Sequence, residues 1–197
     1  MGMTPISLLR LLAVALLGLG SAYAEKVPNP EYKYWAGHKP GSTVTIIKDQ
    51  TIITPKEESK KGKEEVNKVQ TWVVWTIEKV TPEGVQISGK SGVGAMKAGA
   101  DPGGFKQTET IAANIDSAMV NKLEEMGTEK ITVKAGTFEC RKTKRVVTQE
   151  ILGTKVVTTV ITWWSDKVPG GVVRTTLENG DKTSSAVRHV TAFKSAK

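Results

Sequence analysis

The chain has 197 residues with a single cysteine, and 28 lysines and arginines against 20 aspartates and glutamates give it a formal net charge of +8. One cysteine forms no intramolecular disulfide, so the fold has to be stabilised by packing. The basic residues are spread along the chain and often lie beside acids, which is unlike the one-sign stripe with interleaved aromatics typical of nucleic-acid binding. We therefore expect no nucleic-acid partner, and at most a weak, unspecific attraction to anionic surfaces such as lipid headgroups.

Residues 1–24 have the pattern of a cleavable signal peptide. Arg10 supplies the positive charge, residues 11–19 form a short apolar stretch, and Ala22-Tyr23-Ala24 is a small-residue cleavage site. The alternative is an N-terminal membrane anchor, but the stretch has about half of the roughly 20 residues that span a bilayer. No cysteine near the cut offers a lipid attachment site. We expect a soluble protein exported to the periplasm or the extracellular space, with no integral membrane span after cleavage.

Residues 25–197 are expected to form a single β-rich, half-barrel-like domain. Prolines make Glu25 to Gly41 irregular, and its aromatic residues Tyr32, Tyr34 and Trp35 are expected to pin this segment onto the core. β-Branched and aromatic runs separated by glycine-rich or proline-containing turns then predict a series of strands. These cover residues 43–54, 66–80, 85–89, 105–111, 129–133, 138–149, 155–164, 172–178 and 184–193.

One helix is expected among these strands, from Asp116 to Met126. Ile115, Met119, Leu123 and Met126 recur at helical spacing, and Gly127 suits the end of a helix. Residues 56–65 are predicted to be a charged loop and residues 91–104 a glycine-rich one. The predicted fold class is mainly β (α+β), a curved antiparallel sheet or half-barrel wrapped on one or few helices.

Two of the predicted strands are apolar on both faces, although an antiparallel strand with one wet face should alternate cleanly. In residues 71–80, Val73 and Trp75 point one way while Trp72 and Val74 point the other, and residues 155–164 behave similarly. Both faces therefore need cover. A well-filled core and a cavity for an apolar ligand both satisfy this pattern.

Several sequence patterns that look like catalytic or binding motifs lack the context that their chemistry requires. Gly84 to Ser91 matches the phosphate-loop pattern, but Val85 and Ile87 alternate as in a strand and no helix signal follows. His38 and His189 are far apart and have no second ligand at metal spacing. Cys140 lies in a predicted strand and is expected to pack, with a reactive thiol or an intermolecular bridge as the alternatives. We predict no cofactor, no metal and no enzymatic activity, although a hydrolase built from His189, a serine and an aspartate is not eliminated.

A resemblance rests on two segments of the C-terminal half, residues 131–140 (ITVKAGTFEC) and 162–174 (TWWSDKVPGGVVR). They resemble exported bacterial proteins that carry a V-x-A-G-T-F-x-C and W-x-S-x-x-V-P-G-G signature. Those proteins in turn resemble the half-barrel superfamily of lipoprotein carriers, of the LolA/LolB and LppX types. The resemblance implies an antiparallel sheet that wraps around a helix and encloses an apolar cavity for acyl chains. It also implies that Phe138 and Cys140 pack and that Pro169-Gly170-Gly171 forms a turn.

The leading hypothesis is a non-catalytic, exported binding or carrier protein for a lipid or another hydrophobic small molecule. Trp72, Trp75 and Trp163 are the candidates for the cavity wall. The alternative is a structural or interaction module that binds another protein of the cell envelope through an exposed patch or sheet edge.

Overall fold

The computed structural model describes residues 25–54, 63–96, 104–117, 123–151 and 154–196. The predicted signal peptide lies outside these ranges, as do residues 55–62 of the charged loop and residues 97–103 of the glycine-rich loop. Within the described ranges, no helix combines the length and apolar character needed to cross a membrane.

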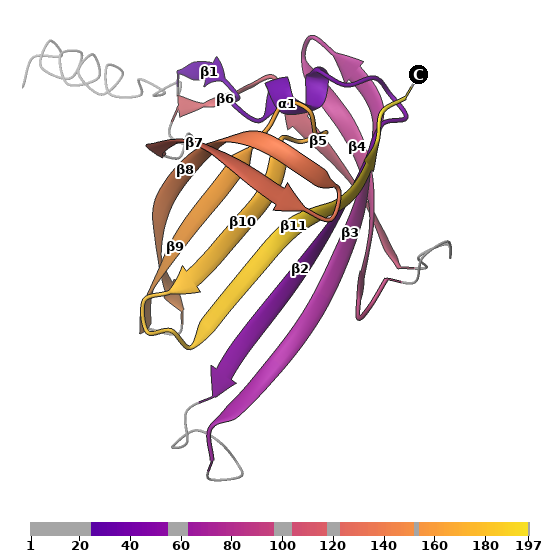
Figure 1. The fold of residues 1–197 in the computed structure, drawn as a ribbon. Helices are drawn as coiled ribbons and strands as arrows, with labels where there is room; N and C mark the ends of the chain where they lie inside the picture. Colours follow the sequence, from indigo (N-terminus) through magenta and orange to yellow (C-terminus); the bar gives the residue numbers. More distant parts are fainter. Residues whose placement is uncertain (1–24, 55–62, 97–103, 118–122, 152–153, 197) are drawn as a thin grey trace, which may run out of the picture.

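Nine strands form one antiparallel sheet that curls but does not close (Figure 1). Its strand order is β5-β4-β3-β2-β11-β10-β9-β8-β7, so β2 pairs with β11 and joins the N-terminal and C-terminal halves of the chain. The strands are β2 (Thr43–Thr54), β3 (Glu65–Thr81), β4 (Gly84–Val93), β5 (Phe105–Ala112), β7 (Glu124–Val133), β8 (Gly136–Ile151), β9 (Thr154–Trp164), β10 (Val172–Asn179) and β11 (Ser184–Lys194).

Three short elements lie at one end of this sheet (Figure 1). Strands β1 (Lys26–Pro28) and β6 (Asn114–Asp116) pair with each other, and α1 (Tyr32–Ala36) follows β1. The β7–β8 hairpin arches across the sheet beside them, and β7 contacts β10 and β11. The fold class is therefore the predicted one, a mainly β, open, curved antiparallel sheet with one short helix in the described chain.

Every predicted strand exists, and the turns that the structure describes lie where glycine, proline and asparagine predict them. At the β3–β4 turn, the Thr81 hydroxyl accepts a hydrogen bond from the Gly84 amide at 3.2 Å. At the β10–β11 turn, the Asp181 carboxylate accepts from the Thr183 amide at 3.0 Å, which lowers the pKa of Asp181. Such side-chain bonds to nearby backbone groups replace ladder bonds and reverse the chain.

The predicted helix from Asp116 to Met126 is wrong at both ends. Asp116 ends β6, whereas Glu124 to Met126 belong to β7; residues 118–122 lie outside the described chain. Instead of helical contacts, Glu125 makes an ion pair with Arg141 of β8 at 2.5 Å. Gly127 has φ +87° at a register shift of the β7–β8 ladder, so it forms a bulge rather than a helix C-cap.

The helix that does form, α1, lies in the segment expected to be irregular, and its aromatic residues are buried as expected. Tyr34 and Trp35 are 9% and 8% exposed. They pack on the turn after β9, where Gly170 and Gly171 have φ +79° and +74°. A Cβ on Gly171 would overlap the ring of Tyr34, and one on Gly170 the indole of Trp35. The aromatic side chains of α1 thus pack directly on the backbone of the Pro169-Gly170-Gly171 turn, which we call the glycine platform.

The hydrophobic core lies between the sheet, α1 and the β7–β8 hairpin, and it includes Val44, Ile77, Ile87, Phe138 and Trp163. Cys140 is a member of this core, as predicted, with 1% of its surface exposed. It is a free thiol, and burial raises its pKa. A buried, protonated thiol is a packing residue rather than a nucleophile.

Candidate functional site: an open trough with a basic row

A row of polar side chains crosses the sheet on one face. The register pairs Lys48 of β2 with Arg188 of β11, Arg188 with Thr175 of β10, and Thr175 with Thr162 of β9. The row ends at Thr143 of β8, which pairs with Thr162. Directly paired residues of antiparallel strands project from the same face. Five residues far apart in sequence therefore form one line, which we call the basic row: Lys48, Arg188, Thr175, Thr162 and Thr143.

The basic row lies along the floor of two adjoining pockets, which we together call the trough. One pocket has a volume of about 400 Å³ and the other about 510 Å³, and both are partly open to solvent. They meet at Val172, Thr175 and Arg188, which line both. Small-molecule sites have volumes of roughly 300–1,000 Å³, so each pocket is large enough to hold a ligand.

The first pocket is closed at one end by the segment that leads into α1. Asn29, Pro30, Glu31 and Tyr34 line it from that side, opposite β8, β9 and β10. The Tyr34 ring stacks on Trp164 with centroids 5.4 Å apart, and its hydroxyl accepts a hydrogen bond from Arg141 at 3.4 Å. The packing of α1 on its glycine platform therefore also sets the end wall of the trough.

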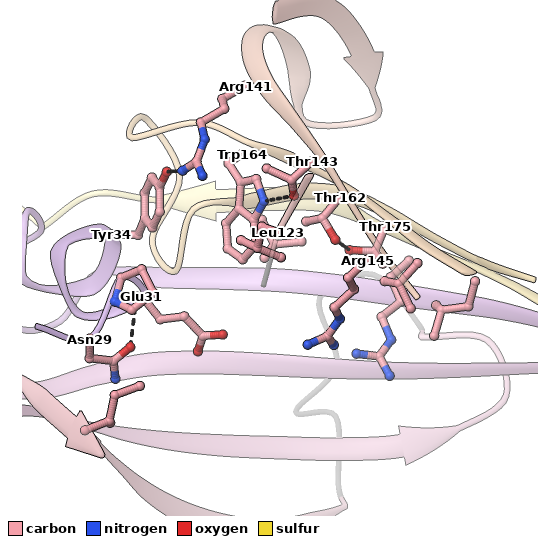
Figure 2. Close-up of a pocket in the computed structure, with 16 residues that line it drawn as sticks. Asn29, Glu31, Tyr34, Leu123, Arg141, Thr143, Arg145, Thr162, Trp164 and Thr175 are labelled. Carbon is pink, nitrogen blue, oxygen red and sulfur yellow. Dashed lines mark hydrogen bonds between the residues drawn. The ribbon is translucent and has the colours of Figure 1, made fainter. Parts of the chain in front are cut away.

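Hydrogen bonds between side chains hold the threonines of the basic row in place (Figure 2). Trp164 Nε1 donates to Thr143 Oγ1 at 2.9 Å, and Thr175 Oγ1 donates to Thr162 Oγ1 at 3.4 Å. All three threonines are less than a tenth exposed. This part of the floor is a preformed surface, which lowers the entropic cost of binding a ligand.

The second pocket is more apolar. Trp75 and Val73 of β3 line it together with Ile46 of β2, and its rim carries Val93 and Phe105. Val93 and Phe105 are 78% and 83% exposed. The register places Val93 opposite Thr71 and Phe105 opposite Ser91, so their side chains belong to the trough face. Large apolar groups exposed beside a hollow are a common property of ligand-binding grooves.

Basic side chains dominate the charge of the trough. Arg141 is held by Glu125, whose hydrogen bonds raise the pKa of the guanidinium. Lys48 donates to Gln50 Oε1 at 2.7 Å, and burial together with the charge of Arg188 lowers the pKa of Lys48. Within the described chain, no ion pair reaches Arg145 or Arg188. The trough thus combines apolar walls with the guanidinium groups of Arg145 and Arg188, whose N–H donors are not used in ion pairs of the described chain.

The three tryptophans predicted for a cavity wall are not brought together. Trp75 lines the second pocket on the face of the basic row. Trp72 lies at the border of the same pocket, but its odd spacing from Trp75 turns its indole to the opposite face, across Gly92. Trp163 lies in the core, where its Nε1 donates to Glu129 at 3.0 Å, and lines neither pocket. A direct ligand contact for any of the three stays a prediction.

The sequence left open whether the second apolar face of a strand packs in a filled core or lines a cavity, and strand β9 has one face of each kind. In β9, Ile161 and Trp163 pack into the core, whereas Val160 and Trp164 line the first pocket.

Sequence reasoning missed Lys48, Arg145, Arg188 and Thr175, because the four come from four strands. Their only sequence signal is a basic or polar residue on an otherwise apolar strand face, and it acquires meaning once the pairing register is known.

The other motifs offer no site in the described chain. Gly84 to Ser91 lie within strand β4, so the phosphate-loop pattern lacks its loop. His189 lies on the face opposite the basic row, with its Nδ1 4.0 Å from an Asp49 carboxylate oxygen. In the described ranges, no cluster of three or more histidine, cysteine, aspartate or glutamate side chains has metal-binding geometry.

No family model and no curated protein matches the sequence. The open, curved antiparallel sheet nevertheless places the chain in a fold class that includes solved structures of other bacterial proteins. It is similar to a protein of Bacteroides fragilis described as exported and with a YmcC-like fold. The two chains share 11% identity over 80% of this chain and 97% of that one, with a TM-score of 0.50. At this identity the likeness shows the fold alone.

Two further solved structures are less similar. A lipoprotein of Parabacteroides distasonis is 14% identical over 80% of this chain and 96% of that one, with a TM-score of 0.48. An outer membrane lipoprotein-sorting protein domain of Vibrio parahaemolyticus is 8% identical over 84% and 90%, with a TM-score of 0.27. Both TM-scores are below 0.5 and support no argument, so the resemblance to lipoprotein carriers stays a prediction.

Proposed function

We propose that this protein is an exported, non-catalytic carrier that holds a lipid or another hydrophobic molecule in the trough. The observation that carries the proposal is the pair of adjoining pockets on one face of an open sheet. Their walls include Trp75, Val160 and Leu177, with Phe105 exposed at the rim. Export is supported by the signal-peptide pattern of residues 1–24 and by the description of the Bacteroides fragilis protein as exported.

Burial of apolar surface supplies the binding free energy in this proposal. Removing apolar surface from water contributes about 25 cal/mol per Å² before the costs of association are subtracted. The half-buried Trp75 and the exposed Phe105 offer such surface without any change in the fold. An open trough also allows a ligand to enter and leave without local unfolding, which suits a carrier.

The test is a titration with the neutral fluorescent probe N-phenyl-1-naphthylamine, which brightens in apolar surroundings. We expect the purified protein to bind it. Thr175→Phe places a ring at the point where the two pockets meet and should weaken binding at least tenfold, about 1.4 kcal/mol. Thr176→Phe is the matched control, because Thr176 pairs with Val187 on the opposite face of the same strand.

Both variants are first checked for folding by circular dichroism, since added volume in a packed site costs about 1–3 kcal/mol. The carrier proposal is contradicted by a wild-type protein that leaves the probe dark, or by equal loss of binding in the two variants. A probe that binds Thr175→Phe as tightly as wild type would place binding outside the trough.

A further inference from the structure

Two like charges face each other at the centre of the trough. Lys48 and Arg188 are directly opposite across the β2–β11 ladder and therefore project from the same face. Like charges in directly opposed positions are destabilising. Burial and, after it, the charge of Arg188 lower the pKa of Lys48.

Within the described chain, no ion pair joins a carboxylate to Lys48 or Arg188. Glu31 is the only acidic side chain among the described residues that line the two pockets, and it belongs to the first pocket. The second pocket is lined by Lys48 and Arg188 and by no carboxylate of the described chain. A third basic group, Arg145, lines the first pocket two residues along β8 from Thr143 of the basic row.

Apolar side chains lie immediately beside these charges. Val73 pairs with Ile46, one step along the same face from Lys48, and Trp75 lies one step beyond Val73. On the other side of the row, Leu177 pairs with Val160. A ligand that contacts both kinds of surface needs an anionic end and an apolar end.

We propose that the ligand of the trough is an anionic amphiphile, with its carboxylate or phosphate head group at Lys48 and Arg188 and its hydrocarbon tail along Val73, Trp75 and Phe105. The inference rests on the carrier function and narrows it to a ligand class. The head group neutralises a repulsive pair, and the guanidinium of Arg188 can donate two parallel hydrogen bonds to it. The half-buried Lys48, already held by Gln50, adds a point charge.

The experiment compares a fluorescent fatty acid, cis-parinaric acid, with its methyl ester, which has the same tail and no charge. We expect the acid to bind at least tenfold more tightly than the ester, because a hydrogen bond to a charged group contributes about 1.5–3 kcal/mol. Arg188→Gln and Lys48→Gln should reduce this preference to less than about threefold while ester binding persists. Lys144→Gln is the matched control: it removes one positive charge from β8, on the face opposite Arg145, and should leave the preference unchanged.

Inorganic phosphate distinguishes an amphiphile site from a plain anion site, and millimolar phosphate should fail to displace the bound acid. A second readout needs no ligand. Arg188→Gln should leave the ligand-free protein as stable as wild type or more stable in low salt, because it removes a repulsion.

The results separate this inference from the function on which it rests. Equal affinity for acid and ester would overturn the inference and leave the carrier function standing, whereas absence of binding by both would remove the function itself. Displacement by phosphate, or an unchanged preference in Arg188→Gln and Lys48→Gln, would also overturn the inference.

Discussion

At the residue scale, the two glycines after Pro169 connect the fold to the trough. Gly171 has a left-handed backbone, and a Cβ there would overlap the ring of Tyr34, which forms an end wall of the first pocket. Gly94 has a similar φ of +90°, but nothing lies within 4 Å of the place where its Cβ would be. The two positions therefore separate backbone strain from loss of packing.

We predict that Gly171→Ala lowers the free energy of unfolding by about 2–4 kcal/mol, because strain at φ > 0 adds to the displacement of Tyr34. Gly94→Ala carries the strain alone and should cost about 1 kcal/mol. Urea denaturation of both variants measures the difference. Equal losses of unfolding free energy in the two variants would show that Gly171 is needed for the backbone conformation of the turn and not for the packing of α1.

At the element scale, strand β7 is attached to the sheet by charged as well as backbone contacts. Glu129 accepts a hydrogen bond from Trp163 of β9 and makes an ion pair with Lys142 of β8 at 2.9 Å. The hydrogen bond from Trp163, followed by that from Lys142, lowers the pKa of Glu129. A carboxyl whose pKa is lower in the folded state stabilises the folded state at pH values above its unfolded-state pKa of about 4.3. This stabilisation is lost as the pH falls through the folded-state pKa.

We predict that Glu129→Gln flattens the pH dependence of stability below about pH 4.5 and weakens the protein at pH 7. Thermal unfolding between pH 3 and pH 7 measures both effects. Glu139→Gln on β8 is the control, because Glu139 is exposed and its carboxylate makes no hydrogen bond or ion pair within the described ranges. A pH profile of Glu129→Gln that parallels wild type would contradict the role assigned to this contact.

The strands were predictable because their signal is local. β2 has the bounds expected from its β-branched run, and β9 and β11 differ from expectation by one residue at one end. The helix prediction failed because the helical spacing of Ile115 and Met126 is coincidental: Ile115 pairs with Val27 of β1, and Met126 lies in β7, which pairs with β8. α1 is five residues long, with no side-chain cap, and its packing on Gly170 and Gly171 is invisible in the local sequence.

At the scale of the whole molecule, the trough is a product of pairing register. Lys48 and Arg188 are 140 positions apart in the chain. They lie side by side because β2, in the N-terminal half of the chain, pairs with β11. Strands that are apolar on both faces indicated that both faces needed cover. In the structure, one face of β9 packs in the core and the other lines a pocket. Sequence patterns therefore predicted that both faces needed cover, by a filled core or by a cavity, whereas the tertiary fold determines which residues pack and which line a pocket.

The central claim is that the trough carries an apolar ligand, and native mass spectrometry of the exported protein purified without detergent tests it most directly. We predict a population with added mass that is released on activation, present in wild type and in Thr176→Phe and absent in Thr175→Phe. An identical spectrum of unliganded protein for all three, from a preparation that also binds no N-phenyl-1-naphthylamine, would contradict the claim.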